Sequence, residues 1–154
     1  MLIVYLIVAA TLILDQATKH LIVYHMDLRQ SIEVIPGFLY MTSHRNAGAA
    51  WGILQDQMAF FYVVTLGVLT ALIIWMRKLD PKKDRLLLIA LALLMGGAIG
   101  NFIDRIFFRE VVDFIDIHIF GYDFPIFNVA DMALTFGVVV MGADALLESR
   151  RGRK

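Results

Sequence analysis

Long apolar runs separated by short polar segments predict a set of membrane-spanning helices. A helix that crosses the hydrocarbon core of a bilayer needs about 20 mostly apolar residues. Segments 58–77 and 86–105 carry charges only at their ends, and segment 125–147 has a similar length although it contains polar residues. We expect a helix over each of these three segments. Pro125 is expected to open the last one, because its missing N–H is harmless in a first helical turn.

The first apolar run, residues 1–14, is short enough to be the core of a signal peptide. No basic residue precedes it, as a secretory signal would need. Apolar residues also resume at 21–24 after a polar band at 15–20. We therefore expect one helix over about 2–24 with a polar band in its last third. A cleaved signal peptide is the alternative.

Basic residues gather on one side of the predicted bundle. Nine of the 14 Lys and Arg residues lie in the loop 77–85 or in the tail 150–154. Short loops rich in Lys and Arg stay in the cytoplasm, and four spans place both termini on the same side. We therefore expect cytoplasmic termini, with outer segments over 25–57 and 105–124.

Both outer segments are too apolar to be plain solvated loops. Residues 31–41 are mostly apolar around a Pro-Gly turn signal, and residues 115–120 alternate between apolar and polar side chains. A period of two is typical of a half-buried strand. The predicted fold is a single integral membrane domain over residues 1–154. It is a mainly α bundle of four transmembrane helices with a small β-sheet and loop region on its outer (extracytoplasmic) face.

Polar and ionisable residues concentrate at the predicted outer ends of the helices. A charge at the centre of a bilayer costs at least ~2.5 kcal/mol, so such residues are candidates for function. Asp113 precedes the predicted outer strand, whereas Asp144 lies near the inner end. The spacing of Gly96 and Gly100 predicts close helix packing, and we expect the third and fourth helices to meet with their amide and carboxylate faces. The polar residues at the outer helix ends are Asp15, Lys19, Asn101, Asp104, Arg105, Asn128 and Asp131.

Some of these residues also have purely structural interpretations. Asp15 and Lys19 are spaced i, i+4 in the order that favours an ion pair. Arg105 could simply extend toward the lipid headgroups. Asp116 and His118 are interpreted as the solvated face of the outer strand.

The residue inventory narrows the chemistry. The chain has no cysteine, no Gly-x-Ser-x-Gly elbow and no His-Glu-x-x-His metal helix, and its four histidines are dispersed. A net charge of zero at pH 7 gives no sign of a nucleic-acid partner. A pair of Ser43 with Lys19 stays open but lacks a motif. Aspartate is abundant at the outer face, and two facing carboxylates that share a proton suffice for hydrolysis without a metal.

Five short blocks of the sequence stand out in combination. They are Asp15-Gln16-Ala17-Thr18-Lys19, Asn46-Ala47-Gly48-Ala49-Ala50-Trp51-Gly52, Gly100-Asn101-Phe102-Ile103-Asp104-Arg105, Val112-Asp113-Phe114 and Phe127-Asn128-Val129-Ala130-Asp131. In this order, over about residues 12–137, they resemble the core motifs of the bacterial lipoprotein signal peptidase (signal peptidase II) family.

The resemblance implies an aspartic endopeptidase of the bacterial plasma (inner) membrane with four transmembrane helices and no cofactor. Such an enzyme cuts just before a lipid-modified cysteine in a prolipoprotein and releases the signal peptide. The resemblance implies that Asp113 and Asp131 form the catalytic dyad, and that a globomycin-type cyclic peptide inhibits the enzyme. The other residues that it places in or around the site are Asn46, Gly48, Asn101, Asp104, Arg105, Asn128, Asp15 and Lys19.

A site at the outer helix ends suits such a substrate. The signal peptide is a transmembrane helix, and the acyl chains of the modified cysteine would stay in lipid. We hypothesise that the apolar outer segments cover the substrate and exclude water, so that Trp51→Ala impairs turnover while the protein stays folded. Nothing in the sequence demands a partner chain, and we expect a monomer in contact with membrane lipid.

Two other classes of protein compete with this interpretation. A proton-coupled carrier could use buried aspartates as a relay, but no polar residues continue through the middle of the second and third spans. A membrane assembly factor could use the glycine spacing, but it would not explain aspartates in separate outer segments.

Overall fold

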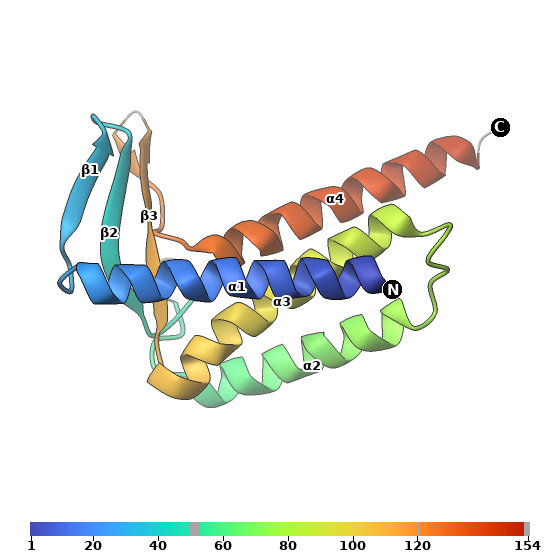
Figure 1. Ribbon diagram of the computed structural model, residues 1–154, viewed down its shortest axis with the longest axis horizontal. Helices are drawn as coiled ribbons and strands as arrows, with labels where there is room; N and C mark the ends of the chain where they lie inside the picture. The colour runs from blue at the N-terminus through green and yellow to red at the C-terminus, as the bar shows by residue number, and fades with distance from the viewer. Residues whose placement is uncertain (50–52, 120, 153–154) are drawn as a thin grey trace.

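The computed structural model describes residues 1–49, 53–119 and 121–152. Four long helices run side by side, and a sheet stands across one end of them (Figure 1). Each helix is long and apolar enough to cross a membrane. Both chain termini lie at the end of the bundle opposite the sheet. The helices are α1 (Leu2–His25), α2 (Met58–Met76), α3 (Arg85–Phe108) and α4 (Val129–Arg151).

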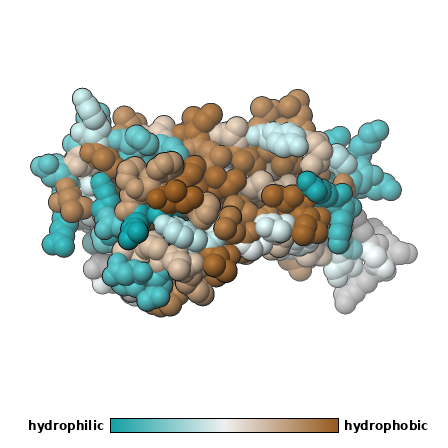
Figure 2. Space-filling model, turned by 90° about the horizontal axis from the view of Figure 1, so that it is seen from below, coloured by the Kyte–Doolittle hydropathy of each residue, from teal (hydrophilic) through white to brown (hydrophobic). Residues whose placement is uncertain are grey.

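Most apolar side chains of the bundle face outward rather than into a core. Only 6% of the apolar window of α2 is buried, compared with 44% for the central helix α3. Figure 2 shows apolar residues gathered across the middle of the molecule and polar residues at both ends. This distribution suits a protein surrounded by lipid, because helices satisfy their backbone groups internally in that medium.

Glycines of α3 let its neighbours approach closely. A Cβ on Gly96 would lie 2.8 Å from Thr11 of α1, and one on Gly97 would lie 2.5 Å from the carbonyl oxygen of Ala130 in α4. A Cβ on Gly100 would lie 2.6 Å from a carboxylate oxygen of Asp15. The packing role predicted for the glycine pair is confirmed, and α3 is in contact with both α1 and α4.

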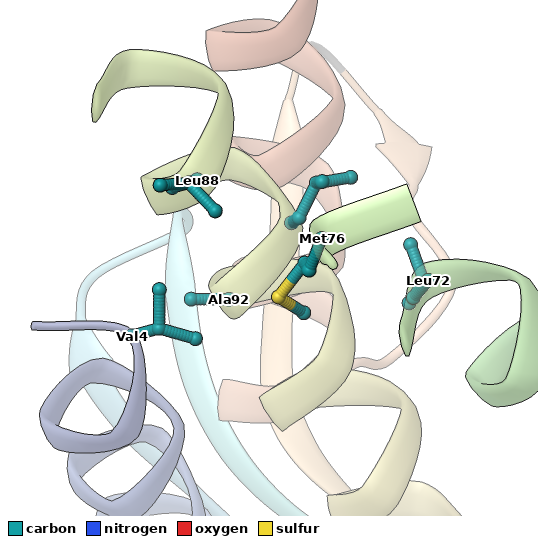
Figure 3. Close-up of a cluster of buried hydrophobic side chains, with 6 residues drawn as sticks. Val4, Leu72, Met76, Leu88 and Ala92 are labelled. Atoms are coloured by element: carbon teal, nitrogen blue, oxygen red, sulfur yellow. The ribbon is translucent and has the colours of Figure 1, made fainter. Parts of the chain in front are cut away.

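At the end opposite the sheet, a small aliphatic cluster joins three helices (Figure 3). Val4 of α1, Leu72 and Met76 of α2, and Leu88 and Ala92 of α3 are all buried there. The cluster fixes the helices where the polar contacts of the sheet end do not reach.

The sheet is antiparallel throughout, with strand order β1-β2-β3-β4. One face carries aliphatic residues in register, such as Ile32 opposite Met41 and Met41 opposite Ile115. Met41 and Ile115 pack against a cluster that includes Ile22 of α1, so this face turns toward the bundle. The predicted alternation is confirmed. The strands are β1 (Ser31–Ile35), β2 (Leu39–Asn46), β3 (Val111–Ile119) and β4 (Tyr122–Asp123).

Polar residues occupy the other face of the sheet in a connected row. Thr42 Oγ1 lies 2.8 Å from Ser31 Oγ and donates to Asp116 Oδ2 at 2.7 Å, and Asp116 Oδ1 lies 3.0 Å from His118 Nε2. Asp116 and His118 are half-buried rather than freely solvated. They are part of the sheet's own hydrogen bonding.

The start of the fourth helix differs from the prediction. The helix begins at Val129, after Asn128 as N-cap, and not at Pro125. The reason is that Phe127 forms a β-bridge with Ile115 of β3, which holds the preceding residues extended. The third strand also begins earlier than the alternation indicated, at Val111, so Asp113 lies on a strand.

Candidate functional site

A cavity of about 480 Å³ opens where the sheet end of α2, α3 and α4 meets β2 and β3. Its apolar wall includes Val64 and Val68 of α2 and Leu134 of α4. Its polar wall lies at the sheet end of the helices. The polar side chains that line it include Asn46, Asn101, Arg105, Asp113 and Asp131.

Asp131 is held by the first turn of α4. Asn128 and Asp131 form a capping box: the Asp131 N–H donates to Asn128 Oδ1 at 3.0 Å, and the Asn128 N–H donates to Asp131 Oδ2 at 3.2 Å. A carboxylate at this position also interacts favourably with the positive end of the helix dipole. The same local geometry that starts the helix therefore fixes the carboxylate at the cavity wall.

Asp113 reaches the same wall from near the start of β3. Its Oδ1 accepts from Asn128 Nδ2 at 2.7 Å, and its Oδ2 accepts from Asn46 Nδ2 at 3.0 Å. Burial raises the pKa of Asp113 from 3.8 to about 7, and the nearby charge of Asp131 raises it as well. Since Asn128 bonds to both carboxyl groups, the two acids belong to one site.

Asn101 of α3 connects this pair to the interior. Its Nδ2 donates to Asp131 Oδ1 at 2.8 Å. Its Oδ1 accepts from Asn128 Nδ2 at 3.1 Å and from Lys19 Nζ at 3.0 Å. Both the oxygen and the nitrogen of the Asn101 amide group therefore have partners, and these partners fix the orientation of the group.

Behind Asn101 lies a buried ionic cluster of Lys19, Asp15 and Asp104. Lys19 Nζ lies 2.9 Å from Asp15 Oδ2 and 3.0 Å from Asp104 Oδ2. Backbone donors also reach these carboxylates: the Ala130 N–H donates to Asp15 Oδ1 at 2.9 Å, and the Val112 N–H donates to Asp104 Oδ2 at 3.1 Å. The cluster therefore ties α1 and α3 to the starts of β3 and α4.

Arg105 turns toward the cavity rather than outward along the helix. Its NH2 group donates to the carbonyl oxygen of Gly48 at 3.1 Å, and its guanidinium carbon lies 4.4 Å from the centre of the Phe61 ring. The carbonyl oxygen of Arg105 accepts from the Tyr62 hydroxyl at 2.8 Å. Gly48 in turn donates its N–H to Asn46 Oδ1 at 2.9 Å, which connects this corner to Asp113.

The hydrogen-bond network includes all ten residues that the sequence placed at the site. It also includes Gln16 and Tyr62, which sequence reasoning missed, as it missed Phe61, whose ring packs against the Arg105 guanidinium group. Gln16 donates to Asp104 Oδ1 at 2.9 Å, and Phe61 and Tyr62 hold Arg105 from α2. Gln16 could have been predicted, because it lies in the polar band of the first helix. Phe61 and Tyr62 lie in an apolar run that gives no sign of a role at the site.

Two further points concern Trp51 and metal binding. Trp51, to which the sequence assigned a covering role, lies outside the described residues. Within residues 1–49, 53–119 and 121–152, no group of three His, Asp or Glu side chains is arranged to hold a metal ion.

Four apolar helices with one buried and one half-buried carboxyl group in a cavity at one end define a multi-pass membrane protein with a site suited to acid–base chemistry. Comparisons with known proteins name the family. The sequence profile described as Signal peptidase (SPase) II matches residues 7–147. The chain is 55% identical to a lipoprotein signal peptidase of Anoxybacillus flavithermus over 137 residues, which cover 89% of this chain and 81% of that protein.

Solved structures agree with these sequence matches. One, described as a bacterial membrane enzyme determined by the in meso method at 2.3 Å resolution, superposes with a TM-score of 0.90 at 50% identity. It covers 98% of this chain, and the chain covers 91% of it. A second, at 1.9 Å resolution, gives a TM-score of 0.84 at 50% identity, with 93% of this chain and 92% of that one covered. The chain belongs to the signal peptidase II family, and it is therefore a peptidase.

Proposed function

We propose that this protein is an aspartic endopeptidase that removes the signal peptide from diacylglyceryl-modified prolipoproteins, with Asp113 and Asp131 as its catalytic dyad. The observation that carries the proposal is that Asn128 hydrogen-bonds to both carboxyl groups at the wall of one cavity. Two carboxyl groups in such a setting share a proton at neutral pH, because both cannot ionise easily at close range.

The shared proton gives the dyad its two chemical roles. The ionised carboxylate takes a proton from a water molecule as the water oxygen attacks the scissile carbonyl carbon. The protonated carboxyl group donates its proton to the carbonyl oxygen, so that no free oxyanion forms. When the tetrahedral intermediate collapses, the C–N bond breaks and the amine leaves with a proton returned by the dyad.

The surrounding residues hold the dyad in place for these steps. Each carboxylate oxygen accepts one N–H from a fixed donor, which leaves its second lone pair free for water or substrate. Arg105 contributes a positive charge at the same cavity. These donors belong to helices and strands rather than to free loops, and so the carboxyl groups are preorganised.

The cavity walls fit a substrate that remains in the membrane. Val64, Val68 and Leu134 continue the cavity along the helices, below its polar end. A signal peptide that spans the bilayer as a helix can therefore place its final residues at the dyad, while the acyl chains of the modified cysteine stay in lipid. A globomycin-type cyclic peptide would compete for this cavity.

The distribution of basic residues supports an orientation in the bacterial plasma membrane. Segments 77–85 and 150–154 hold nine of the 14 Lys and Arg residues. Residues 77–85 and the end of α4 lie at the opposite end of the bundle from the sheet (Figure 1). By the positive-inside rule, both termini are cytoplasmic, and the dyad lies near the outer face. The protein is expected to act as a monomer without a cofactor.

A cleavage assay tests the dyad directly. Purified protein in lipid nanodiscs is incubated with a lipidated precursor peptide, and the two products are resolved by mass. Asp113→Asn and Asp131→Asn are each expected to reduce kcat/KM by about 10²-fold to 10⁴-fold or more, because each removes one partner in proton transfer. Asp144→Asn, in α4 but far from the cavity, is the matched control and should cleave normally. Near-normal cleavage by either dyad variant, in protein that elutes as a single folded species, would refute the assignment.

A further inference from the structure

The two carboxyl groups of the dyad receive different kinds of support. Asp131 Oδ2 accepts a backbone N–H at the start of α4, where the helix dipole is positive. Its Oδ1 accepts from Asn101, whose own oxygen accepts from the Lys19 ammonium. Asp113 lies on a strand and accepts no backbone N–H of α4, and its two donors are the neutral side-chain amides of Asn46 and of Asn128, the N-cap residue.

Lys19 determines which way the Asn101 amide group faces. Asn101 Oδ1 has two donors in front of it, Lys19 Nζ at 3.0 Å and Asn128 Nδ2 at 3.1 Å. A flipped amide would place its NH₂ group against these donors and would turn its oxygen toward Asp131. The Lys19 ammonium group therefore keeps the N–H of Asn101 pointed at Asp131. It also polarises this N–H, because hydrogen bonds in a chain strengthen one another.

We propose that Lys19 acts through Asn101 as a positioning residue that keeps Asp131 ionised and leaves the shared proton on Asp113. The inference rests on the proposed aspartic mechanism and adds roles for its two acids. Asp131 then activates the water, and Asp113 donates to the scissile carbonyl. The raised pKa of Asp113, about 7, agrees with a proton held there at neutral pH.

Other charged groups also face the dyad, and they shape its titration. Arg105 interacts with both acids and with Asp104. Asp15 opposes Lys19 in the buried cluster. His44 is the register partner of Asp113 on β2 and is exposed. A test of Lys19 must therefore change its contact with Asn101 while leaving the net charge of the cluster alone.

The double variant K19M/D15N meets this requirement. Lys19, Asp15 and Asp104 together carry one negative charge, and Asp104 alone carries the same charge in the double variant. The variant removes the donor to Asn101 without leaving an unbalanced pair of buried carboxylates. The single variant D15N is the control, because it retains Lys19 and its contact with Asn101.

The experiment is the pH dependence of kcat/KM for a lipidated precursor peptide in nanodiscs. In the wild-type protein, the acid limb reports the group that must be ionised, and the alkaline limb reports the group that must hold the proton. In K19M/D15N, we expect the acid limb to move to higher pH by about one unit, the size of effect that one hydrogen bond to a carboxylate has, because the charge of the cluster is unchanged and only the support through Asn101 is lost. The alkaline limb, which belongs to Asp113, should stay in place.

Other outcomes contradict the proposal in distinguishable ways. A lower rate at every pH with both limbs in place would mean that Lys19 is only structural. A shift of the alkaline limb instead would put the proton on Asp131. If the double variant does not fold, D15N still provides a test: its acid limb should move to lower pH, because Lys19 is no longer opposed by Asp15, and an unchanged or raised limb contradicts the proposal. Cleavage that survives D113N or D131N would instead overturn the dyad itself.

Discussion

At the scale of single residues, the buried charged side chains, which are costly to remove from water, lie next to one another. Lys19, Asp15 and Asp104 are at most 2% exposed, yet every one of them has an oppositely charged partner. Removing one member of a buried ion pair costs about 3–5 kcal/mol, because the other charge is left without compensation. The cluster therefore works as a unit, and it supports the proposed dyad through the contact of Lys19 with Asn101.

The raised pKa of Asp113 makes a prediction about stability. Because burial raises this pKa from 3.8 to about 7, the folded protein binds a proton that the unfolded chain has already released between these pH values. The contribution of Asp113 to the free energy of unfolding is fully present below pH 4 and is lost as the pH rises through 7. The loss amounts to about 4 kcal/mol at most. The melting temperature in detergent, measured from pH 4 to pH 8.5, is expected to fall more steeply in wild-type protein than in Asp113→Asn.

Asp144→Asn serves as the control for this titration as well. It changes the same functional group in a partly exposed position at the far end of α4. Its melting curve should follow the wild-type slope. Equal slopes in wild type and Asp113→Asn would show that Asp113 does not hold its proton in the folded state.

At the scale of elements, α3 is the helix on which the others are assembled. Its glycines bring α1 and α4 close enough for side chains of the three helices to share hydrogen bonds. The Lys19 contact with Asn101 and the Asn101 contact with Asp131 both cross such a helix interface. Helix packing is therefore a condition for the site as well as for the fold.

A substitution at Gly97 tests this dependence. A Cβ there would meet the backbone oxygen of Ala130 at 2.5 Å, which cannot move without shifting the start of α4. Gly97→Ala is expected to destabilise the protein by about 1–3 kcal/mol, the usual range for overpacking, and to lower cleavage because Asp131 lies one residue further on. Thermal unfolding and the cleavage assay measure the two effects.

Gly142→Ala is the matched control in α4, because nothing lies within 4 Å of its added Cβ. It should leave both stability and cleavage close to wild type. If Gly97→Ala behaves in the same way, the close approach of α3 and α4 is not required for the site.

At the scale of the whole molecule, the polar groups of the chain are sorted to the two ends of an apolar bundle (Figure 2). The sheet end carries the cavity with Asp113 and Asp131, and the opposite end carries both termini. An asymmetric molecule of this kind must insert in one direction if it is to meet substrates on one side. The proposed orientation therefore has consequences that can be measured in cells.

The absence of cysteine from the chain makes an accessibility test simple. Ser31→Cys, on the exposed edge strand β1, should react with a membrane-impermeant maleimide in intact spheroplasts. Ser149→Cys, near the C-terminus, should react only after the membrane is permeabilised. The reverse pattern of labelling would contradict the proposed orientation.

The sequence predicted a large part of this architecture because the relevant signals are local. Apolar runs located the four helices to within a few residues, although α4 both begins and ends four residues later than the predicted 125–147. A period of two located the outer strand, although it missed the first residues of β3, where Val111 to Phe114 are all buried and show no alternation. Pro125 misled the prediction because a proline fits a position before a helix as well as the first turn of one. The bridge between Phe127 and Ile115, which delays the helix, is not visible in local sequence.

The amino-acid sequence by itself determined that this is a four-helix membrane protein with basic residues at one end and aspartates and asparagines at the other, since hydropathy and periodicity depend only on neighbouring residues. Only the tertiary structure decided which polar atoms bond to one another. Asn128 reaches Asp113 across 15 positions of the chain, and the Ala130 N–H reaches Asp15 across 115. Such pairings depend on how closely helices pack and on where a strand crosses their ends. For that reason the unequal support of Asp113 and Asp131 emerged only from the folded molecule.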